Sequence, residues 1–538
     1  MRARFTIVFV LGPTLVAVAC GSNGSLDPGG SPSGTGSGPS SGSTSGNPSS
    51  GANAGSGSGA GPSGASSSGP GTAPSTLTGN SSGSRSSSSA GASGAATNPG
   101  SGSGSTGSVP SGAGSTAGSS SSGSGSSAGS SSSAGASGAG EMAGVAPANA
   151  VVVNPGTVHQ HISGFGASSA WEAGYLNAAD PTTLFSTTSG AGLSLFRVRI
   201  QPSPAGTTSA AEISMALAAQ ALGATVWATP WTPPASDKSN ATTIEGTLTD
   251  PSAWAASLAS YVTTMKAAGI HLYAISAQNE PDADVTYESC VYTATTLATF
   301  VGGSMGPALA SSGVKIMAPE TQDWGDFKTF EPALAANSAA WAATSIVATH
   351  EYGGTPAAYP AIQAAGKEFW ETEWYVTGAE DTTMANGLIV ANEIYQALTV
   401  ANMNAWHYWW FYSSGNGGLW DTGAATWAKR LWVLGNFSRF VRPGFYRVDV
   451  AGSAPPSGVS VIAFDNPADN TVAIVAINTG GATSMTIFVQ GSSWPAQVVP
   501  WVTSASENLT AGTAIPLTGG SFAAPLSAQS VTTFVGAP

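Results

Sequence analysis

Two short segments place carboxylates at the ends of runs that read as buried strands. In "AISAQNEPD", an apolar run leads into Asn279 and Glu280 and is stopped by Pro281. In "EFWETEW", Glu373 closes a second such run. Two carboxyl groups brought together can cleave a glycosidic bond, because one protonates the leaving oxygen and the other meets the oxocarbenium-like centre. The alternative for each glutamate is a solvated loop position, which is how we interpret the neighbouring Asp282.

The two glutamates can meet only if their strands share one sheet edge. Strand-like runs occupy 162–169, 193–200, 224–231, 272–280, 314–320, 345–352, 368–374 and 405–411. Ala-rich helical runs separate them, at 209–223, 251–269, 293–313, 327–344, 355–366, 383–402 and 428–441. This alternation predicts an α/β fold, a (β/α)₈ TIM barrel over 161–442, whose active face lies at the C-terminal ends of its strands.

The pattern changes after residue 442. Segments of alternating apolar and polar residues follow one another without a helical signal, which predicts a β-sandwich side domain over 443–538. A strand-like segment at 146–160 precedes the barrel, and we expect it to join the sheet of that side domain.

Polar and aromatic residues gather at the predicted strand ends. They are Arg197, Arg199, Trp227, Trp231, Asn279, Glu280, Glu320, His350, Tyr352, Glu373, Trp409 and Trp410. Indole rings offer flat apolar faces on which sugar rings can stack. Several converging carboxylates and indoles favour a carbohydrate-cleaving site over a set of unrelated loop residues.

A series of motifs resembles the retaining glycoside hydrolases of family 30, and among them the bacterial xylanases. The motifs are "WATPWTPP", "SAQNEPD", "ATHEYGG", "WETEWY", "FSRFVRPGFYRVD" and the C-terminal "SAQSVTTFV", and the likeness spans 150–538. The resemblance implies that Glu280 is the general acid/base and Glu373 the nucleophile of a double displacement. Such a mechanism needs no metal or organic cofactor, and it places the two carboxyl groups roughly 5–5.5 Å apart.

The resemblance also implies substrate-binding roles for residues near the same strand ends: Asn279, Trp231, Arg197, His350, Tyr375 and Trp410. Asn279 would bind the sugar 2-hydroxyl and Trp231 would form a wall of the same subsite. A hydrogen-bonded packing role is the alternative for His350. Because side chains alternate along a strand, we expect Glu371 and Glu373 to point the same way, with Glu371 deeper and structural.

One position departs from the family pattern. Family 30 xylanases that require a glucuronic acid branch carry an arginine just after strand 8, whereas this chain has Ser413 and Ser414 there. Serine cannot replace the charge that pairs with a carboxylate. We therefore expect an endo-xylanase acting on β-1,4-xylan without a strict need for glucuronic acid branches.

Other readings stay open at this point. A family 30 enzyme of another specificity would keep the fold and mechanism: a glucuronoxylanase, a β-1,6-glucanase or galactanase, or a glucosylceramidase-like enzyme. A non-catalytic surface lipoprotein that binds polysaccharide is the alternative from a different class. The presence of both Glu280 and Glu373 weighs against it.

The first 145 residues predict export rather than chemistry. Residues 1–20 combine a basic start, a short apolar stretch and "AVAC", as in a bacterial lipoprotein signal that would lipidate Cys20. Residues 21–145 are Gly- and Ser-rich and read as a disordered linker. We expect an exported protein, either a lipoprotein of the outer membrane or cell surface or a secreted protein, whose membrane contact is limited to the lipid anchor.

Charge and cysteine content limit the partners. The formal net charge is −13, which argues against nucleic acid or an anionic membrane as a partner. With Cys20 modified, Cys290 is the only other cysteine, so an internal disulfide or a multi-cysteine metal site is excluded. We expect a monomer whose partner is a polysaccharide.

Overall fold

The structure, a computed structural model, describes residues 145–491 and 495–537. Its larger part is a closed parallel barrel. Its strands are β2 (Gly164–Ser168), β3 (Leu195–Ile200), β4 (Thr225–Pro230), β5 (Leu272–Ser276), β6 (Lys315–Met317), β7 (Thr344–Thr349), β8 (Glu368–Glu371) and β9 (Ala405–Ser413). Each pairs in parallel with the next, and β9 pairs with both β2 and β8. The predicted barrel is confirmed.

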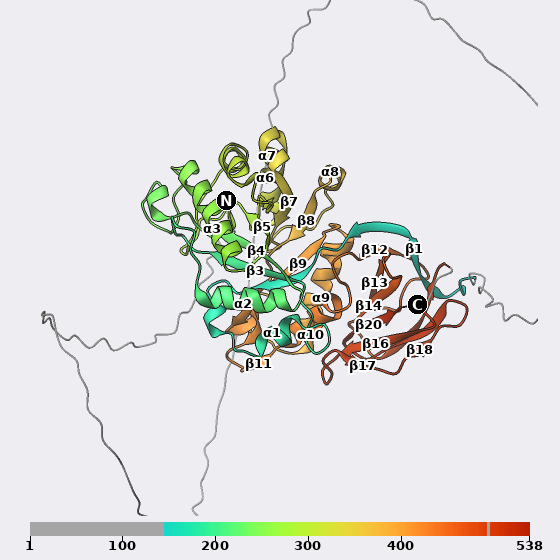
Figure 1. Cartoon of the computed structure of the whole chain (residues 1–538). Coiled ribbons are helices and arrows are strands. Elements are labelled where there is room, and N and C mark those ends of the chain that lie inside the picture. Colours follow the sequence, from blue (N-terminus) through green and yellow to red (C-terminus); the bar gives the residue numbers. More distant parts are fainter. Residues whose placement is uncertain (1–144, 492–494, 538) are drawn as a thin grey trace, which may run out of the picture. The chain divides into compact units, whose positions relative to one another are not determined.

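Helices cover the outside of the barrel (Figure 1). They are α1 (Asp180–Phe185), α2 (Ala210–Ala221), α3 (Pro251–Ala267), α4 (Ala294–Phe300), α5 (Gly306–Leu309), α6 (Trp324–Ala336), α7 (Ser338–Ala343), α8 (Pro360–Ala364), α9 (Met384–Thr399) and α10 (Lys429–Ser438). Side-chain caps set several starts: Ser209 accepts the amide of Glu212 at α2, and Asp250 accepts that of Ala253 at α3.

One helix expected at 293–313 is divided. α4 continues into a π-helical stretch, Val301–Met305, before α5 begins. Gly302 lies in this stretch, where a β-carbon would come within 2.6 Å of the backbone of Ala340. The glycine thus allows α7 to approach closely, and the widened turn accommodates that contact.

The barrel has two apolar layers. Inside the strands lies a small core made of Leu195, Trp227, Ala274, Met317, Ile346, Ala348, Trp370 and Ala405. A much larger core fills the space between the strands and the helices. The closed inner layer leaves only the strand ends for polar chemistry.

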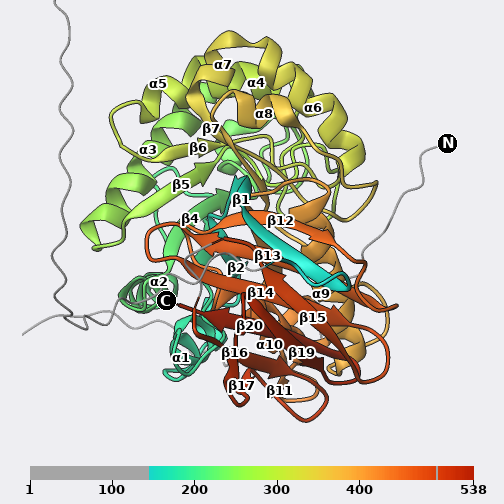
Figure 2. The same cartoon turned by 90° about the vertical axis from the view of Figure 1, so that its right-hand side faces the viewer.

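The late strands form the β-sandwich-like domain (Figure 2). They are β12 (Tyr446–Gly452), β13 (Val459–Asn466), β14 (Thr471–Asn478), β15 (Thr483–Val489), β16 (Gln497–Thr503), β17 (Thr510–Ala511), β18 (Ile515–Pro516), β19 (Ser521–Leu526) and β20 (Ser530–Gly536). β1 (Ala150–His161) lies in the same sheet, antiparallel to β12 and parallel to β15. Their inward residues form a separate core.

This domain packs on α9 and α10 of the barrel. Asn436 of α10 donates to the Trp501 carbonyl at 3.0 Å, and Thr533 donates to the Asn436 carbonyl at 2.7 Å. Gln160 at the end of β1 donates to the Leu398 carbonyl of α9 at 2.7 Å. Side chains of each part therefore satisfy backbone carbonyls of the other.

Some short elements were not predicted. They include α1, β19, and the strands β10 (Gly418–Asp421) and β11 (Thr426–Trp427) that extend the sheet beside β9. β19 contains Pro525, which argues against a strand when sequence alone is considered. β19 lies at the edge of its sheet, where a missing amide costs no ladder bond.

Within residues 145–491 and 495–537, no helix combines the length and apolar character needed to cross a membrane. Cys20 and the predicted signal and linker lie outside the described residues.

Candidate active site

The predicted site residues come together where the chain leaves the barrel strands. β5 ends at Ser276 rather than at 280, and the next residues hydrogen-bond to neighbouring strand ends. The Asn279 amide donates to the Pro230 carbonyl at 2.8 Å, and the Glu280 amide donates to the Glu320 carbonyl at 2.9 Å. Glu280 and Glu320 both have positive φ, 44° and 61°. This left-handed backbone turns the chain out of the strand and is uncommon for residues other than glycine.

Glu280 lies almost fully buried, with an exposed fraction of 4%. One carboxylate oxygen lies 3.1 Å from Nδ1 of His350, and the other accepts the hydroxyl of Tyr287 at 3.1 Å. Tyr287 belongs to the loop after Glu280 and carried no sequence signal. These contacts fix the carboxyl group toward the barrel axis.

Glu373 is held from the opposite side. Its Oε1 accepts the Tyr352 hydroxyl at 2.9 Å, and its Oε2 accepts Nη1 of Arg197. Its exposed fraction is 5%. Both oxygens are thus oriented by donors.

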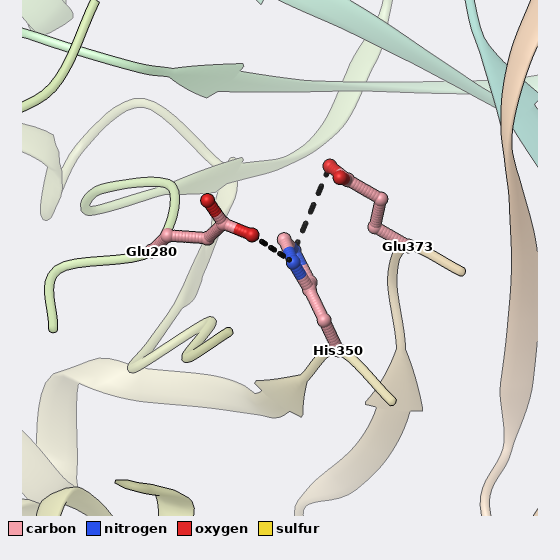
Figure 3. Close-up of side chains that lie close together, drawn as sticks. All are labelled: Glu280, His350 and Glu373. Carbon is pink, nitrogen blue, oxygen red and sulfur yellow. Dashed lines mark hydrogen bonds and ion pairs between the residues drawn. The ribbon is translucent and has the colours of Figure 1, made fainter. Parts of the chain in front are cut away.

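Figure 3 shows the Glu280 and Glu373 carboxyl groups on either side of the His350 ring. One oxygen of each glutamate and one ring nitrogen of His350 lie within 4.8 Å of one another. Inverting glycosidases separate their carboxyl groups by roughly 6.5–9.5 Å, and the oxygens here are closer than that. The arrangement suits two carboxyl groups acting on the same glycosidic bond.

His350 is fully buried and lies beside both glutamates, with Nδ1 on Glu280 and Nε2 near Glu373. Burial alone would lower its pKa, but the carboxylates of Glu373, Glu280 and Glu320 raise it to about 10. Its Nε2 lies 3.8 Å from carboxylate oxygens of Glu320 and of Glu373. His350 thus pairs with three carboxylates of the site.

Arg197 connects the nucleophile to two further side chains. Its Nη2 lies 2.6 Å from Oδ1 of Asn279 and 3.0 Å from Oε1 of Glu320. Burial opposes the charge, but the nearby carboxylates of Glu320 and Glu373 raise the pKa of the guanidinium. Because Asn279 accepts from Arg197 through its oxygen, its NH₂ group carries the remaining donors of this side chain.

Burial sets the protonation of the nucleophile. Desolvation raises the pKa of Glu373 above its ordinary value of 4.5, and the Glu280 carboxylate adds to this. The charges of His350 and Arg197 lower it in part. Glu373 therefore becomes a free carboxylate only above its usual titration range.

The expectation that the Glu371 and Glu373 side chains point the same way is wrong. β8 ends at Glu371, whose carboxylate accepts the His407 amide of β9 at 2.6 Å, while Glu373 contacts Arg197 and Tyr352. The regular pairing of β8 with β7 stops at Glu371, and Trp374 bridges Tyr408 of β9 instead, so Glu373 lies outside the regular strand. Burial and the neighbouring Glu351 carboxylate hold the pKa of Glu371 well above its usual range. The contact of Glu371 with the backbone of β9 suits a structural role.

Aromatic side chains surround the carboxylates. Trp231 and Trp409 pack with Ala170, and Tyr287, Tyr375 and Trp410 border them. Trp231 is only 2% exposed, and the guanidinium of Arg197 covers it at 4.6 Å from the ring centroid. Trp227 lies below the site in the inner core, where it donates to His407 at 3.0 Å. Trp227 is therefore not available to stack on a sugar.

Trp171 was missed by the sequence analysis. It lies three positions after β2, and its ring meets that of Trp231 edge-on at 4.8 Å. It is 40% exposed, and the Arg199 guanidinium lies 4.9 Å from its ring centroid. An aromatic residue soon after the first barrel strand was the available signal.

Asp282 is more than a solvated loop acid. Its carboxylate accepts the Gln322 amide at 3.1 Å and so joins the loops after β5 and β6. Burial and the nearby Glu280 carboxylate raise the pKa of Asp282 well above its usual range.

A closed parallel barrel with a buried carboxyl pair at its strand ends, joined to a β-sandwich, is the arrangement of a (β/α)₈ glycoside hydrolase. Residues 444–534 match the glycosyl hydrolase family 30 beta sandwich domain. Over 409 residues the chain is 34% identical to the glucuronoxylanase XynC of Bacillus subtilis (strain 168), and this match covers 73% of the chain and 92% of the relative.

Solved structures agree with this. A xylanase of glycoside hydrolase family 30 subfamily 8 from Clostridium acetobutylicum is 37% identical with a TM-score of 0.66, covering 72% of this chain and 100% of that one. A family 30 endoxylanase from Clostridium papyrosolvens C71 is 36% identical with a TM-score of 0.63 at the same coverage. The chain belongs to glycoside hydrolase family 30.

Proposed function

We propose that this chain is a retaining endo-xylanase that cleaves the β-1,4-linked backbone of xylan. The observation that carries the proposal is the carboxyl pair, Glu280 and Glu373, with oxygens within 4.8 Å of one another in a chain whose relatives are xylanases. The proposed reaction is a double displacement.

In the first step Glu280 donates its proton to the leaving glycosidic oxygen while Glu373 attacks the anomeric carbon. This breaks the glycosidic bond and forms a covalent glycosyl-enzyme. The NH₂ group of Asn279 is placed to donate to the sugar 2-hydroxyl as charge develops. In the second step Glu280, now ionised, takes a proton from water, the oxygen attacks the anomeric carbon, and Glu373 is released.

The anomeric form of the first product tests this mechanism. Proton NMR recorded early in the hydrolysis of xylohexaose should show the β-anomer before mutarotation. An initial α-anomer would exclude double displacement. A panel of xylans and β-1,6-glucans should give internal cleavage of xylan alone, and no hydrolysis of any β-glycan would favour a binding protein.

We further propose that glucuronic acid branches are not required. No lysine or arginine occurs between Trp410 and Lys429, the segment that follows the last barrel strand. Arg430 is buried and donates to the carbonyls of Gly418, Asp381 and Gly415. Arg199 is already paired with Glu288 through two nitrogens. Arg430 is therefore occupied by carbonyl groups, and Arg199 already holds a carboxylate.

Rates on glucuronoxylan and on unbranched xylo-oligosaccharides test this point. We expect similar kcat/KM values for both, and a large preference for the branched substrate would refute it. Ser414 is exposed, whereas the Ser413 hydroxyl donates to the Ser414 carbonyl at 3.1 Å. Ser414→Arg should thus raise kcat/KM on glucuronoxylan by about tenfold, and Ser414→Gln is the uncharged control.

We also propose export and lipid tethering through Cys20. The support is the basic start, the apolar stretch and the "AVAC" motif of residues 1–20. Labelled palmitate should be incorporated into the wild-type chain but not into Cys20→Ala, and that variant should be released from the envelope. Equal release of both proteins would contradict the anchor.

A further inference from the structure

We propose that Glu320 is a positioning residue of the reaction, which holds Arg197 and leaves the catalytic pocket without net charge when the general acid is protonated. The inference rests on the proposed roles of Glu280 and Glu373. It adds a third carboxylate that touches neither sugar nor water and acts through its partners.

The contacts of Glu320 are all within the site. It is fully buried, and Oε1 lies 3.0 Å from Nη2 of Arg197. Its Oε2 accepts the hydroxyl of Thr229 at 2.7 Å. The same Oε1 lies 3.8 Å from Nε2 of His350. Glu320 therefore contacts both cations that flank the proposed catalytic pair.

The backbone of Glu320 also supports the general acid. Its carbonyl accepts the Glu280 amide at 2.9 Å, and both residues have left-handed backbone. Such conformations are strained for residues other than glycine and persist where surrounding contacts impose them. The pairing with Arg197 and Thr229 supplies those contacts, so Glu320 links the turn at Glu280 to the guanidinium that holds Glu373.

The charges of the pocket balance only when Glu320 is counted. The carboxylates are Glu280, Glu320 and Glu373, and the cations are Arg197 and His350. With Glu280 protonated, two anions face two cations. In the glycosyl-enzyme Glu373 is an uncharged ester and Glu280 is ionised, so again two anions face two cations. Without Glu320 the pocket would carry one excess positive charge in both states.

The other titratable groups around the pocket do not change this balance. Burial raises the pKa values of the neighbouring tyrosines, so they stay neutral: Tyr287, Tyr352 and Tyr375. Burial lowers the pKa of His407 to about 3. Burial holds the pKa values of Asp282 and Glu371 well above the usual range, so neither supplies a dependable negative charge.

Glu320→Gln tests the charge, because the amide is nearly the same size as the carboxylate. The bell-shaped dependence of kcat/KM on pH should move as a whole to lower pH, by roughly one unit, since excess positive charge favours both ionised glutamates. At the pH optimum of the wild type, kcat/KM should fall by about tenfold or more. A purely structural loss would lower the yield of folded enzyme and leave the pH dependence of kcat/KM unchanged.

Glu320→Asp tests the contact, since it keeps the charge but withdraws it from Arg197. The pH profile of kcat/KM for this variant should match that of the wild type, while kcat falls. If Glu320→Gln does not fold, as judged by circular dichroism, wild-type kcat in Glu320→Asp would overturn the proposal. Glu368→Gln is the matched control, because Glu368 is a buried glutamate paired with a cation at the other end of the barrel. The pH profile of kcat/KM for this variant should be that of the wild type.

The outcomes separate this inference from the proposed function. Wild-type hydrolysis by Glu280→Gln and Glu373→Gln would remove the catalytic assignment itself. If those variants lose hydrolysis but Glu320→Gln keeps the wild-type pH profile of kcat/KM, the role of Glu320 alone would be overturned.

Discussion

The two ends of the barrel each bury a glutamate beside a cation, but they do so differently. At the N-terminal end, Glu368 accepts the Ser163 hydroxyl at 2.6 Å, Tyr273 at 2.7 Å, Lys315 at 2.5 Å and Trp370 at 2.8 Å. We call Glu368 with these four donors the floor cluster. At the C-terminal end, three carboxylates share Arg197, His350 and a few hydroxyl groups.

The difference lies in how completely each carboxylate is satisfied. Burial would raise the pKa of Glu368, but hydrogen bonds from Lys315 and its other donors outweigh burial and lower it. Burial raises the pKa of Glu373, the Glu280 carboxylate adds to this, and the charges of His350 and Arg197 offset it only in part. A carboxylate surrounded by four donors stays ionised and inert, whereas one that is held but not saturated can attack a sugar carbon or exchange a proton.

Glu373→Gln should give the largest effect. Removing the nucleophile should lower kcat on xylan by on the order of 10⁴-fold or more, because the amide cannot form the glycosyl-enzyme. Steady-state rates on xylan, with circular dichroism to confirm folding, check this result. A loss below tenfold would mean that the two barrel ends do not differ in function as described.

Glu280→Gln should lower kcat on xylan by about 10²–10⁴-fold. The first step should recover on an aryl xyloside with an acidic phenol, because that leaving group departs without protonation. The values of kcat/KM on both substrates, which report the first step, measure the difference. Equal losses of kcat/KM on both would show that Glu280 does not act as the general acid.

Glu368→Gln should change stability rather than activity. It leaves donors of the floor cluster without an ionic partner, so the free energy of unfolding should fall by about 1–3 kcal/mol. Urea unfolding measures this, and kcat/KM at 25 °C should remain within about twofold. A large loss of kcat/KM in folded protein would abolish the contrast between the two ends.

The pH dependence of stability should have opposite signs at the two ends. Glu368 has a lowered pKa, so its contribution is present above 4.5 and lost as pH falls further. Glu373 has a raised pKa, so its contribution is present below 4.5 and lost as pH rises. Unfolding of Glu368→Gln should therefore depend less steeply on acid than that of the wild type, and an unchanged slope would contradict this.

Much of the site followed from the sequence because strand ends in a parallel barrel converge. The motifs around Glu280 and Glu373 predicted a carboxyl pair, and the structure brings Asn279, Trp231, Arg197, His350, Tyr375 and Trp410 to the same end. Tyr287 and Trp171 were missed because they belong to loops, whose paths depend on the rest of the fold. Short elements such as α1 gave too few residues for a periodic signal.

The sequence by itself determined the barrel rhythm, the side domain and the acids that end the strands, because periodicity and strand order are local properties. Only the tertiary structure decided how those acids are paired. Glu371 and Glu373 are two positions apart, yet the end of the regular strand between them gives them different surroundings. Glu320 looked like one more acid at a strand end, but its contacts with Arg197, Thr229 and His350 depend on strands distant in sequence. The charge balance of a buried site is a property of all its neighbours together, and no single segment encodes it.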